Sequence, residues 1–195
     1  VASRGLGDVY KRQLMPCTLP AVLADAAVCR GSFHAGLRTD VPDTVFSAFS
    51  AALQKAQADG SLLTASLFRC ESHLFFYAEG LNRPFTPQGL CPALDAALLP
   101  WPPALGETSP RPWAAMQPYF YHDIPTTAAD WQQGRCPQRR RGRIALLPPD
   151  KWCSYMEHHL RIVTEGLVEG DRWHLICVQE GVLFSYCLLY TSDAA

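Results

Sequence analysis

The chain has 195 residues, of which 48% are apolar, and its formal net charge at pH 7 is −1. This composition is typical of a globular protein and argues against a disordered tail or a nucleic-acid binder with a strongly basic face. No apolar run approaches the roughly 18 to 20 residues that a membrane-spanning helix requires. A chain of this length can form one medium domain or two small ones, each with a buried core.

The two ends of the chain are complementary at the level of their codons. One coding of Asp8–Gln13 has a reverse complement that translates, from its second base, as the sequence of Cys187–Ser192. Unrelated protein termini have no reason to encode antisense copies of each other, and the string looks like the transposase end used to prepare sequencing libraries. We therefore expect residues 1–13 and 187–195 to be non-native and adapter-derived, so that the native part is a fragment. Residues 14–30 form a leader whose status the sequence leaves open.

Residues 31–123 are predicted to form a first unit with the order strand, helix, strand, strand, helix, strand. Asp43 or Thr44 is the expected N-cap of the first helix, and Asp59-Gly60 ends it. The helix carries apolar residues at the spacing of one buried face; they are Val45, Phe46, Phe49, Leu53 and Ala56. The later elements are expected at Leu62–Cys70, Leu74–Ala78, Pro92–Leu99 and Met116–Tyr121. This order is that of the split βαβ or ferredoxin-like unit.

A second unit repeats this pattern after a basic linker at residues 124–140. An Arg-Gly pair opens both units, and EGVLFSY at Glu180–Tyr186 repeats ESHLFFY at Glu71–Tyr77. The repeats lie about 110 residues apart, which is too long for a solenoid and suits a duplicated small domain. The second unit, residues 141–186, ends after its first three or four elements. We therefore predict an α+β fold of tandem ferredoxin-like units that form a pseudo-dimeric α/β barrel, with the second unit truncated.

The helix of the second unit is the predicted place of chemistry. Compared at an offset of about 110 residues, His159 occupies the position at which the first unit buries Phe49. Tyr155 lies one turn earlier and projects from the same face. An imidazole or a phenol costs free energy to bury unless it is hydrogen-bonded, so the two residues are a candidate site. The alternative is a core histidine that a neighbour such as Tyr155 or Glu165 satisfies. The apolar-spaced face comprises Trp152, Tyr155, Met156, His159, Ile162, Val163 and Leu167.

The segment Tyr155–Leu167 has the pattern Tyr-x-x-x-His-x-x-Ile-x-x-Glu-x-Leu and precedes a short loop and two strand-like runs. This arrangement is similar to the L-rhamnose mutarotase family, over about thirty residues. The resemblance implies ferredoxin-like chains that pair as dimeric α/β barrels, with the matching Tyr155 and His159 lining a sugar site. It also implies that the histidine donates or accepts the proton. Trp113 of the first unit looks like the family's aromatic element near the last strand, but the first unit lacks the tyrosine and the histidine.

We therefore expect a mutarotase-like carbohydrate isomerase that interconverts sugar anomers, with His159 as general acid and base and Tyr155 assisting. Opening a hemiacetal ring requires one proton delivered to the ring oxygen and another removed from the anomeric hydroxyl. An imidazole can do either near neutral pH. Further substrate contacts are expected from Trp152, Glu165 and Trp113. The substrate is a small-molecule sugar, and neither a metal nor a cofactor is required.

Two other functions are compatible with the predicted architecture, because fold alone does not decide function. The first alternative is a non-catalytic small-molecule or sugar-binding barrel protein. The second is a barrel of the monooxygenase or haem-degrading kind. No nucleic-acid or membrane partner is expected, whereas a homodimer or an intramolecular pseudo-dimer is.

The cysteines favour a reducing compartment. Of the eight cysteines, all except Cys187 lie outside the expected adapter segments, and their spacing is irregular without a C-x-x-C pair. Metal sites and disulfide frameworks usually show closer or more regular spacing. Reduced thiols in the cytoplasm are therefore expected.

Overall fold

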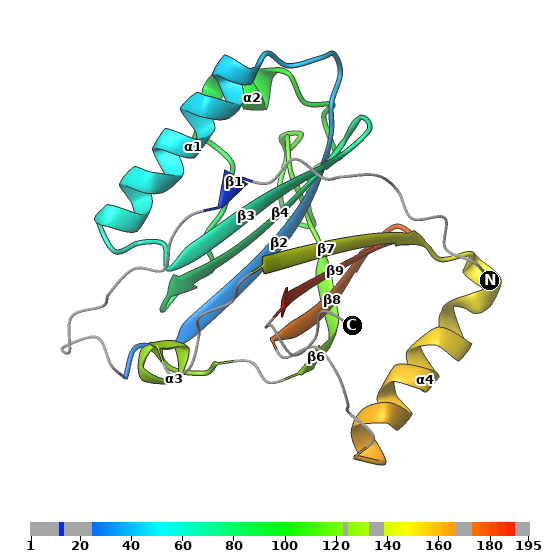
Figure 1. The fold of residues 1–195 in the computed structure, drawn as a ribbon. Helices are drawn as coiled ribbons and strands as arrows, with labels where there is room; N and C mark the ends of the chain where they lie inside the picture. The colour runs from blue at the N-terminus through cyan, green and yellow to red at the C-terminus, as the bar shows by residue number, and fades with distance from the viewer. Residues whose placement is uncertain (1–11, 14–24, 123–124, 133–138, 167–172, 190–195) are drawn as a thin grey trace. The chain divides into compact units, whose positions relative to one another are not determined.

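The chain is divided into two compact units, and each has its own antiparallel sheet (Figure 1). The N-unit comprises residues 7–116 and 126–132, and the C-unit comprises residues 1–6, 117–125 and 133–195. The computed structural model describes residues 12–13, 25–122, 125–132, 139–166 and 173–189. The expected leader and adapter segments therefore lie mostly outside the described residues.

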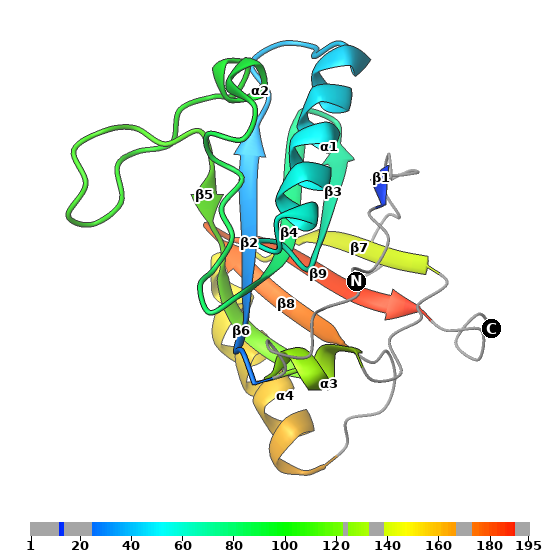
Figure 2. The ribbon, with the colours of Figure 1, turned by 90° about the vertical axis from the view of Figure 1, so that its left-hand side faces the viewer.

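The N-unit has a sheet with the strand order β1-β3-β4-β2-β5. Its strands are β1 (Arg12–Gln13), β2 (Val28–Gly36), β3 (Thr64–Cys70), β4 (His73–Leu81) and β5 (Ala114–Ala115). Its helices are α1 (Asp43–Ala58), α2 (Pro92–Ala96) and α3 (Ala128–Gln132). α1 lies along one face of this sheet (Figure 2), and its apolar side chains form the largest core of the protein with that face.

The sequence predicts the buried face of α1 correctly. Four of the five predicted apolar residues are buried, and Val45 is half-buried; the four are Phe46, Phe49, Leu53 and Ala56. The helix ends at Asp59, and Gly60 follows with a φ of 80°, a conformation that glycine adopts without strain. The N-cap is Pro42 instead of Asp43 or Thr44, so the helix begins one residue earlier than the expected cap allows.

The opposite face of the N-unit sheet buries a carboxylate. Glu79 is 1% exposed, and it accepts hydrogen bonds from the Tyr77 hydroxyl at 2.6 Å and from Trp131 Nε1 at 2.6 Å. Trp131 belongs to α3, which begins with a capping box between Thr127 and Asp130. Because a buried polar group that loses its hydrogen-bond partner costs free energy, the hydrogen bond from Trp131 fastens α3 to β4.

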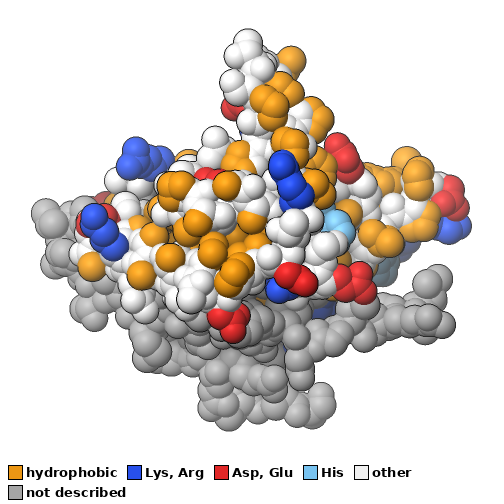
Figure 3. Space-filling model, turned by 90° about the horizontal axis from the view of Figure 1, so that it is seen from above, with side chains coloured by type: hydrophobic (Ala, Val, Ile, Leu, Met, Phe, Trp, Pro, Cys, Tyr) orange, Lys and Arg blue, Asp and Glu red, His pale blue; other side chains and the backbone are white. Residues whose placement is uncertain are grey.

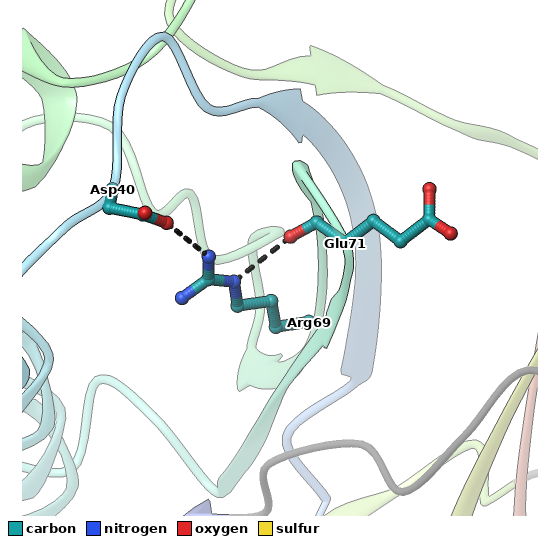
Figure 4. A network of polar contacts seen from close by, with 3 residues as sticks. All are labelled: Asp40, Arg69 and Glu71. Carbon is teal, nitrogen blue, oxygen red and sulfur yellow. Dashed lines mark hydrogen bonds and ion pairs between the residues drawn. The ribbon is translucent and has the colours of Figure 1, made fainter.

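The hairpin between β3 and β4 is held at its turn by Arg69. The guanidinium forms an ion pair with Asp40 at 2.9 Å, and its Nε donates to the backbone carbonyl of Glu71 at 2.9 Å. Figure 4 shows that the Glu71 carboxylate points away from this contact. The backbone of Glu71 is left-handed, with a φ of 52°, and Glu180 in the corresponding turn of the C-unit has a φ of 48°. The repeated sequence motif thus carries a repeated turn.

The C-unit has a four-stranded sheet with the order β6-β8-β9-β7. Its strands are β6 (Gln117–His122), β7 (Arg139–Leu146), β8 (His174–Gln179) and β9 (Val182–Leu189). A 3₁₀ turn, η2 (Pro149–Lys151), leads directly into α4 (Trp152–Thr164). The order strand, helix, strand, strand from β7 to β9 is that of β2 to β4 in the N-unit.

Three boundaries differ from those expected. The segment Met116–Tyr121 does not close the first unit's sheet, because β5 pairs with β2 whereas β6 pairs with β8. The arginines at 139 and 140, expected in a linker, belong to β7, the edge strand that pairs with β9. β9 continues through Cys187 to Leu189, since this apolar stretch extends the strand pattern whatever its origin.

The Arg-Gly pairs that open the two units are displaced by one residue in the sheets. Gly31 pairs with Ala78, whereas Gly142 pairs with Tyr186, the counterpart of Tyr77. A one-residue shift turns every side chain of a strand to the other face. The hairpin motifs therefore mark the repeat more faithfully than the Arg-Gly pairs do.

These elements establish an α+β fold with two antiparallel sheets, as predicted at that level. Within the described ranges, no helix is long and apolar enough to cross a membrane. The face seen in Figure 3 carries acidic and basic side chains scattered among hydrophobic ones, in keeping with a net charge of −1.

We expect Trp131→Phe to lower the free energy of unfolding by about 1–3 kcal/mol, because the buried Glu79 carboxylate loses a donor. Trp101→Phe is the matched control, since the buried Trp101 Nε1 has no hydrogen-bond partner among the described residues. Thermal unfolding followed by circular dichroism measures both. An equal loss in the two variants would contradict the role given to the carboxylate.

Candidate functional site

The long helices of the two units correspond residue by residue, but the offset in residue number is smaller than the offset of about 110 expected from the sequence. α1 follows Pro42, which has a φ of −60° and a ψ of 148°; η2 and α4 follow Pro148, with a φ of −59° and a ψ of 143°. α1 has 16 residues, and η2 and α4 together span the same length with 3 and 13. Gly60 and Gly166, both with positive φ, follow the two helices. The helices therefore correspond from first residue to last, with Pro42 matched to Pro148.

Burial along the helices supports this correspondence. The partly buried residues of α4 are Trp152, Tyr155, His159 and Ile162, and their counterparts in α1 are the buried Phe46, Phe49, Leu53 and Ala56. His159 therefore replaces Leu53, and the expected match with Phe49 is corrected. Met156 and Val163, expected on the inner face, are 38% and 48% exposed. The imidazole of His159 thus still occupies a helix position at which the N-unit has an apolar side chain.

The shift arises in the connection from strand to helix. The Leu37 amide donates to Ser72 O at 2.6 Å, and the Leu147 amide donates to Gly181 O at 2.7 Å, so these leucines mark equivalent strand ends. Pro148 follows Leu147 directly, whereas four residues separate Leu37 from the corresponding proline. A comparison at one constant offset cannot represent this deletion.

The imidazole of His159 is fixed by its own helix. Its Nδ1 lies 3.0 Å from the backbone carbonyl oxygen of Tyr155. Because a carbonyl only accepts, Nδ1 carries the proton, and in the neutral ring Nε2 keeps its lone pair. The aromatic rings of three residues surround the imidazole, with centroid distances of 4.4 Å for Tyr155, 5.8 Å for Tyr119 and 5.2 Å for Phe120.

His159 lines a groove of about 420 Å³ between α4 and β6. The groove is mainly apolar and contains two charged or titratable groups from α4, His159 and Glu157. Its lining comprises Tyr119, Phe120, Tyr121, Met156, Glu157, His159, Leu160 and Val163. A mainly apolar concavity with a few convergent polar groups is the usual form of a small-molecule site.

Tyr155 is not part of the groove lining. Its ring packs against Tyr119, at a centroid distance of 5.9 Å, and against the core beneath α4. Burial raises the pKa of Tyr119 well above the ordinary range of a phenol, and the nearby Tyr155 phenol adds to this effect. The Tyr119 phenol therefore stays protonated in neutral solution and is no base.

The other predicted site residues lie apart from the imidazole. Trp152 is half-buried one turn before Tyr155, and lines a shallow hollow with Pro148 and Pro149. Glu165 caps the end of α4 and forms an ion pair with Arg161 at 3.0 Å. Trp113 belongs to the N-unit, where it is 2% exposed and its Nε1 donates to Asp95 at 2.9 Å.

The β6 side of the groove was not found from the sequence. Tyr119, Phe120 and Tyr121 were assigned to the last strand of the first unit, and no local pattern shows that β6 pairs with β8. Glu157 also lines the groove, although it does not share a helix face with His159. Among the described residues, no group of three or more His, Cys, Asp or Glu side chains is arranged to hold a metal ion.

Exchanging the residues at positions 53 and 159 should change the free energy of unfolding differently in the two units. We expect Leu53→His to cost roughly 2–4 kcal/mol, because Leu53 is 5% exposed in an apolar core, and an imidazole there loses its hydration and the packing of the leucine. His159→Leu should change stability by less than about 1 kcal/mol or increase it. Urea unfolding of both variants measures the difference; similar losses would contradict the correspondence of the positions.

Alkaline pH should weaken the C-unit through Tyr119. Its pKa is raised above the ordinary value of 10.0, so the unfolded state releases this proton first as pH rises. The stabilisation is complete below about pH 10 and is lost progressively above it. We expect the unfolding midpoint of wild type to fall faster than that of Tyr119→Phe between about pH 10 and 12. Parallel curves would contradict the burial of this phenol.

The chain was compared with protein-family models, with curated proteins and with solved structures, and none of the three comparisons found a match.

Proposed function

We propose that both units derive from one ferredoxin-like module. The N-unit has the element order strand, helix, strand, strand, helix, strand from β2 to β5, and its four strands have the sheet order β3-β4-β2-β5. The C-unit repeats the first four elements with the same pairing of its hairpin. The matched helices and the two left-handed glutamates support a common origin.

We propose that the C-unit is a mutarotase-like carbohydrate isomerase that interconverts sugar anomers through His159. One observation supports this above all: the imidazole lines a groove while its Nδ1 is held by the Tyr155 carbonyl. Nε2 is then the ring atom left for a ligand. An oriented imidazole beside a small-molecule groove is what general acid–base catalysis requires.

The imidazole can take part both in opening the sugar ring and in closing it. In the protonated form, Nε2 donates its proton to the ring oxygen as the bond from the anomeric carbon to that oxygen breaks, and solvent water takes the proton of the anomeric hydroxyl as the carbonyl forms. In the neutral form, Nε2 takes the proton back when the ring closes on the other face of the carbonyl, and water returns a proton to the carbonyl oxygen. Nδ1 keeps its proton and its hydrogen bond throughout, so the imidazole need not rotate between the two steps.

Tyr155 assists by positioning in this proposal. Its carbonyl accepts from Nδ1, and its ring lies against the imidazole at 4.4 Å, so it limits the rotation of His159. A positioned proton donor contributes roughly 10²–10⁴-fold to a rate. Trp152 and Glu165 stay predicted substrate contacts, whereas Trp113 is buried in the core of the N-unit.

The apolar lining suits one face of a sugar. Pyranose rings present C–H groups on a face and hydroxyls at the edge. Aromatic and aliphatic side chains bind the C–H face. The rings of Tyr119, Phe120 and Tyr121 supply such a surface on the β6 side. A deoxy sugar has a methyl group in place of a hydroxymethyl group. It therefore buries more apolar surface against these rings than a fully hydroxylated hexose does.

Anomeric exchange should slow by roughly 10²–10⁴-fold in His159→Ala, because the proton donor is removed. Saturation-transfer NMR with L-rhamnose and with other deoxy sugars measures the exchange rate. His73→Ala is the control, since this exposed imidazole belongs to the N-unit and does not line the groove. Equal enzyme-dependent rates in wild type and His159→Ala would remove the isomerase assignment.

A further inference from the structure

The outer side of α4 carries an apolar strip, which we call the α4 strip. It consists of Met156, Leu160 and Val163, which are 38%, 63% and 48% exposed. These residues recur at intervals of four and three, so they lie on one side of the helix. On β6, Tyr121 is 60% exposed and lines the same groove, so it extends the apolar surface.

The corresponding side of α1 is polar. The match of Pro42 to Pro148 gives the counterparts of the α4 strip, which are Ser50, Gln54 and Gln57. Polar side chains suit a helix surface that faces water, whereas contiguous exposed apolar side chains mark surfaces of association. The difference between the matched helices therefore indicates that α4 has a partner on this side.

Charged side chains flank the α4 strip on the side away from His159. Side chains advance by about 100° per residue, so Glu157 lies about 60° and Arg161 about 100° around the axis from Leu160, in the same direction. Arg161 binds Glu165 through Nε at 3.0 Å, which leaves the terminal nitrogens of the guanidinium as donors. Glu157 forms no hydrogen bond or ion pair with the residues that the structure describes. One flank of the strip thus carries both an acidic and a basic group.

An antiparallel pairing of two α4 helices brings these charges together in pairs of opposite sign. In a two-fold arrangement centred on Leu160, this residue meets its own copy, and Met156 lies opposite Val163 of the second copy. A helix rises about 1.5 Å per residue, so Glu157 lies about 4.5 Å before the centre and Arg161 about 1.5 Å after it. Reversal of the second helix places its Arg161 within about 3 Å of Glu157 along the axis. The symmetry forms this pair twice.

We propose that two copies of this chain associate through the α4 strip, as a two-fold dimer with antiparallel α4 helices. The strip forms the apolar centre of the interface, and the pairs of Glu157 with Arg161 form its polar rim, which is the usual anatomy of a protein interface. The strip also lines the groove, so a second copy and a ligand in the groove compete for the same side chains. The association does not rest on the proposed function.

Sedimentation velocity of the full chain, across a range of protein concentrations, tests the dimer. Wild type should form dimers as the concentration rises. Leu160→Glu should raise the dissociation constant by roughly 100-fold, because two carboxylates then meet at the centre of the interface. Leu105→Glu is the matched control, since Leu105 is 106% exposed and belongs to the N-unit. This variant should associate as wild type does.

A charge exchange tests the antiparallel arrangement. Glu157→Arg and Arg161→Glu should each raise the dissociation constant by roughly 3–10-fold, because like charges then face each other across the interface. The double variant restores pairs of opposite sign and should recover most of this loss. Circular dichroism of each variant checks that the fold is retained.

A wild-type chain that stays monomeric at every concentration would overturn the proposal. A dimer that Leu160→Glu leaves intact, or that Leu105→Glu weakens equally, would overturn it as well, because the interface would then lie elsewhere. A double charge variant that associates no more tightly than the single variants would overturn the antiparallel arrangement.

Discussion

The hydrogen bond from His159 Nδ1 to the Tyr155 carbonyl sets the orientation of the imidazole that lines the groove of the C-unit. A histidine at a position facing a sheet must satisfy at least one ring nitrogen, because an unpaired buried donor costs free energy. Here the helix supplies the acceptor one turn back, and the surrounding aromatic rings hold the plane of the imidazole. The other ring nitrogen, Nε2, does not take part in this hydrogen bond, and the imidazole lines the groove.

The two units place different side chains at the same positions of one helix. In the N-unit, Phe49 and Leu53 fill the space between α1 and the sheet, and Trp113 stacks on Phe49 at 6.4 Å. In the C-unit, Tyr155 and His159 occupy the same helix positions, and the groove opens beside them. An apolar side chain at such a position stabilises the fold by burial, whereas an imidazole loses part of that stabilisation and gains a titratable group.

Local patterns were sufficient for much of the fold. The buried face of α1, the stop at Asp59 and Gly60, and the paired hairpins followed from spacing and turn chemistry, which act within a few residues. The candidate histidine also followed, because a polar ring in an apolar stripe is visible without a structure. The sequence did not show which residue of α1 the histidine replaces. Four residues are missing before Pro148, and this deletion shifts the alignment without changing any local pattern.

The sequence by itself determined the long helix of each unit and the hairpin that follows it, and that position 159 carries an imidazole on the inner side of α4. Only the tertiary structure decided what that imidazole meets. β6 lies far from α4 along the chain, and its pairing with β8 brings Tyr119 and Phe120 to the ring. Strand pairing depends on backbone hydrogen bonds that nearly any sequence can form, so the partner of an edge strand is set by packing across the whole unit.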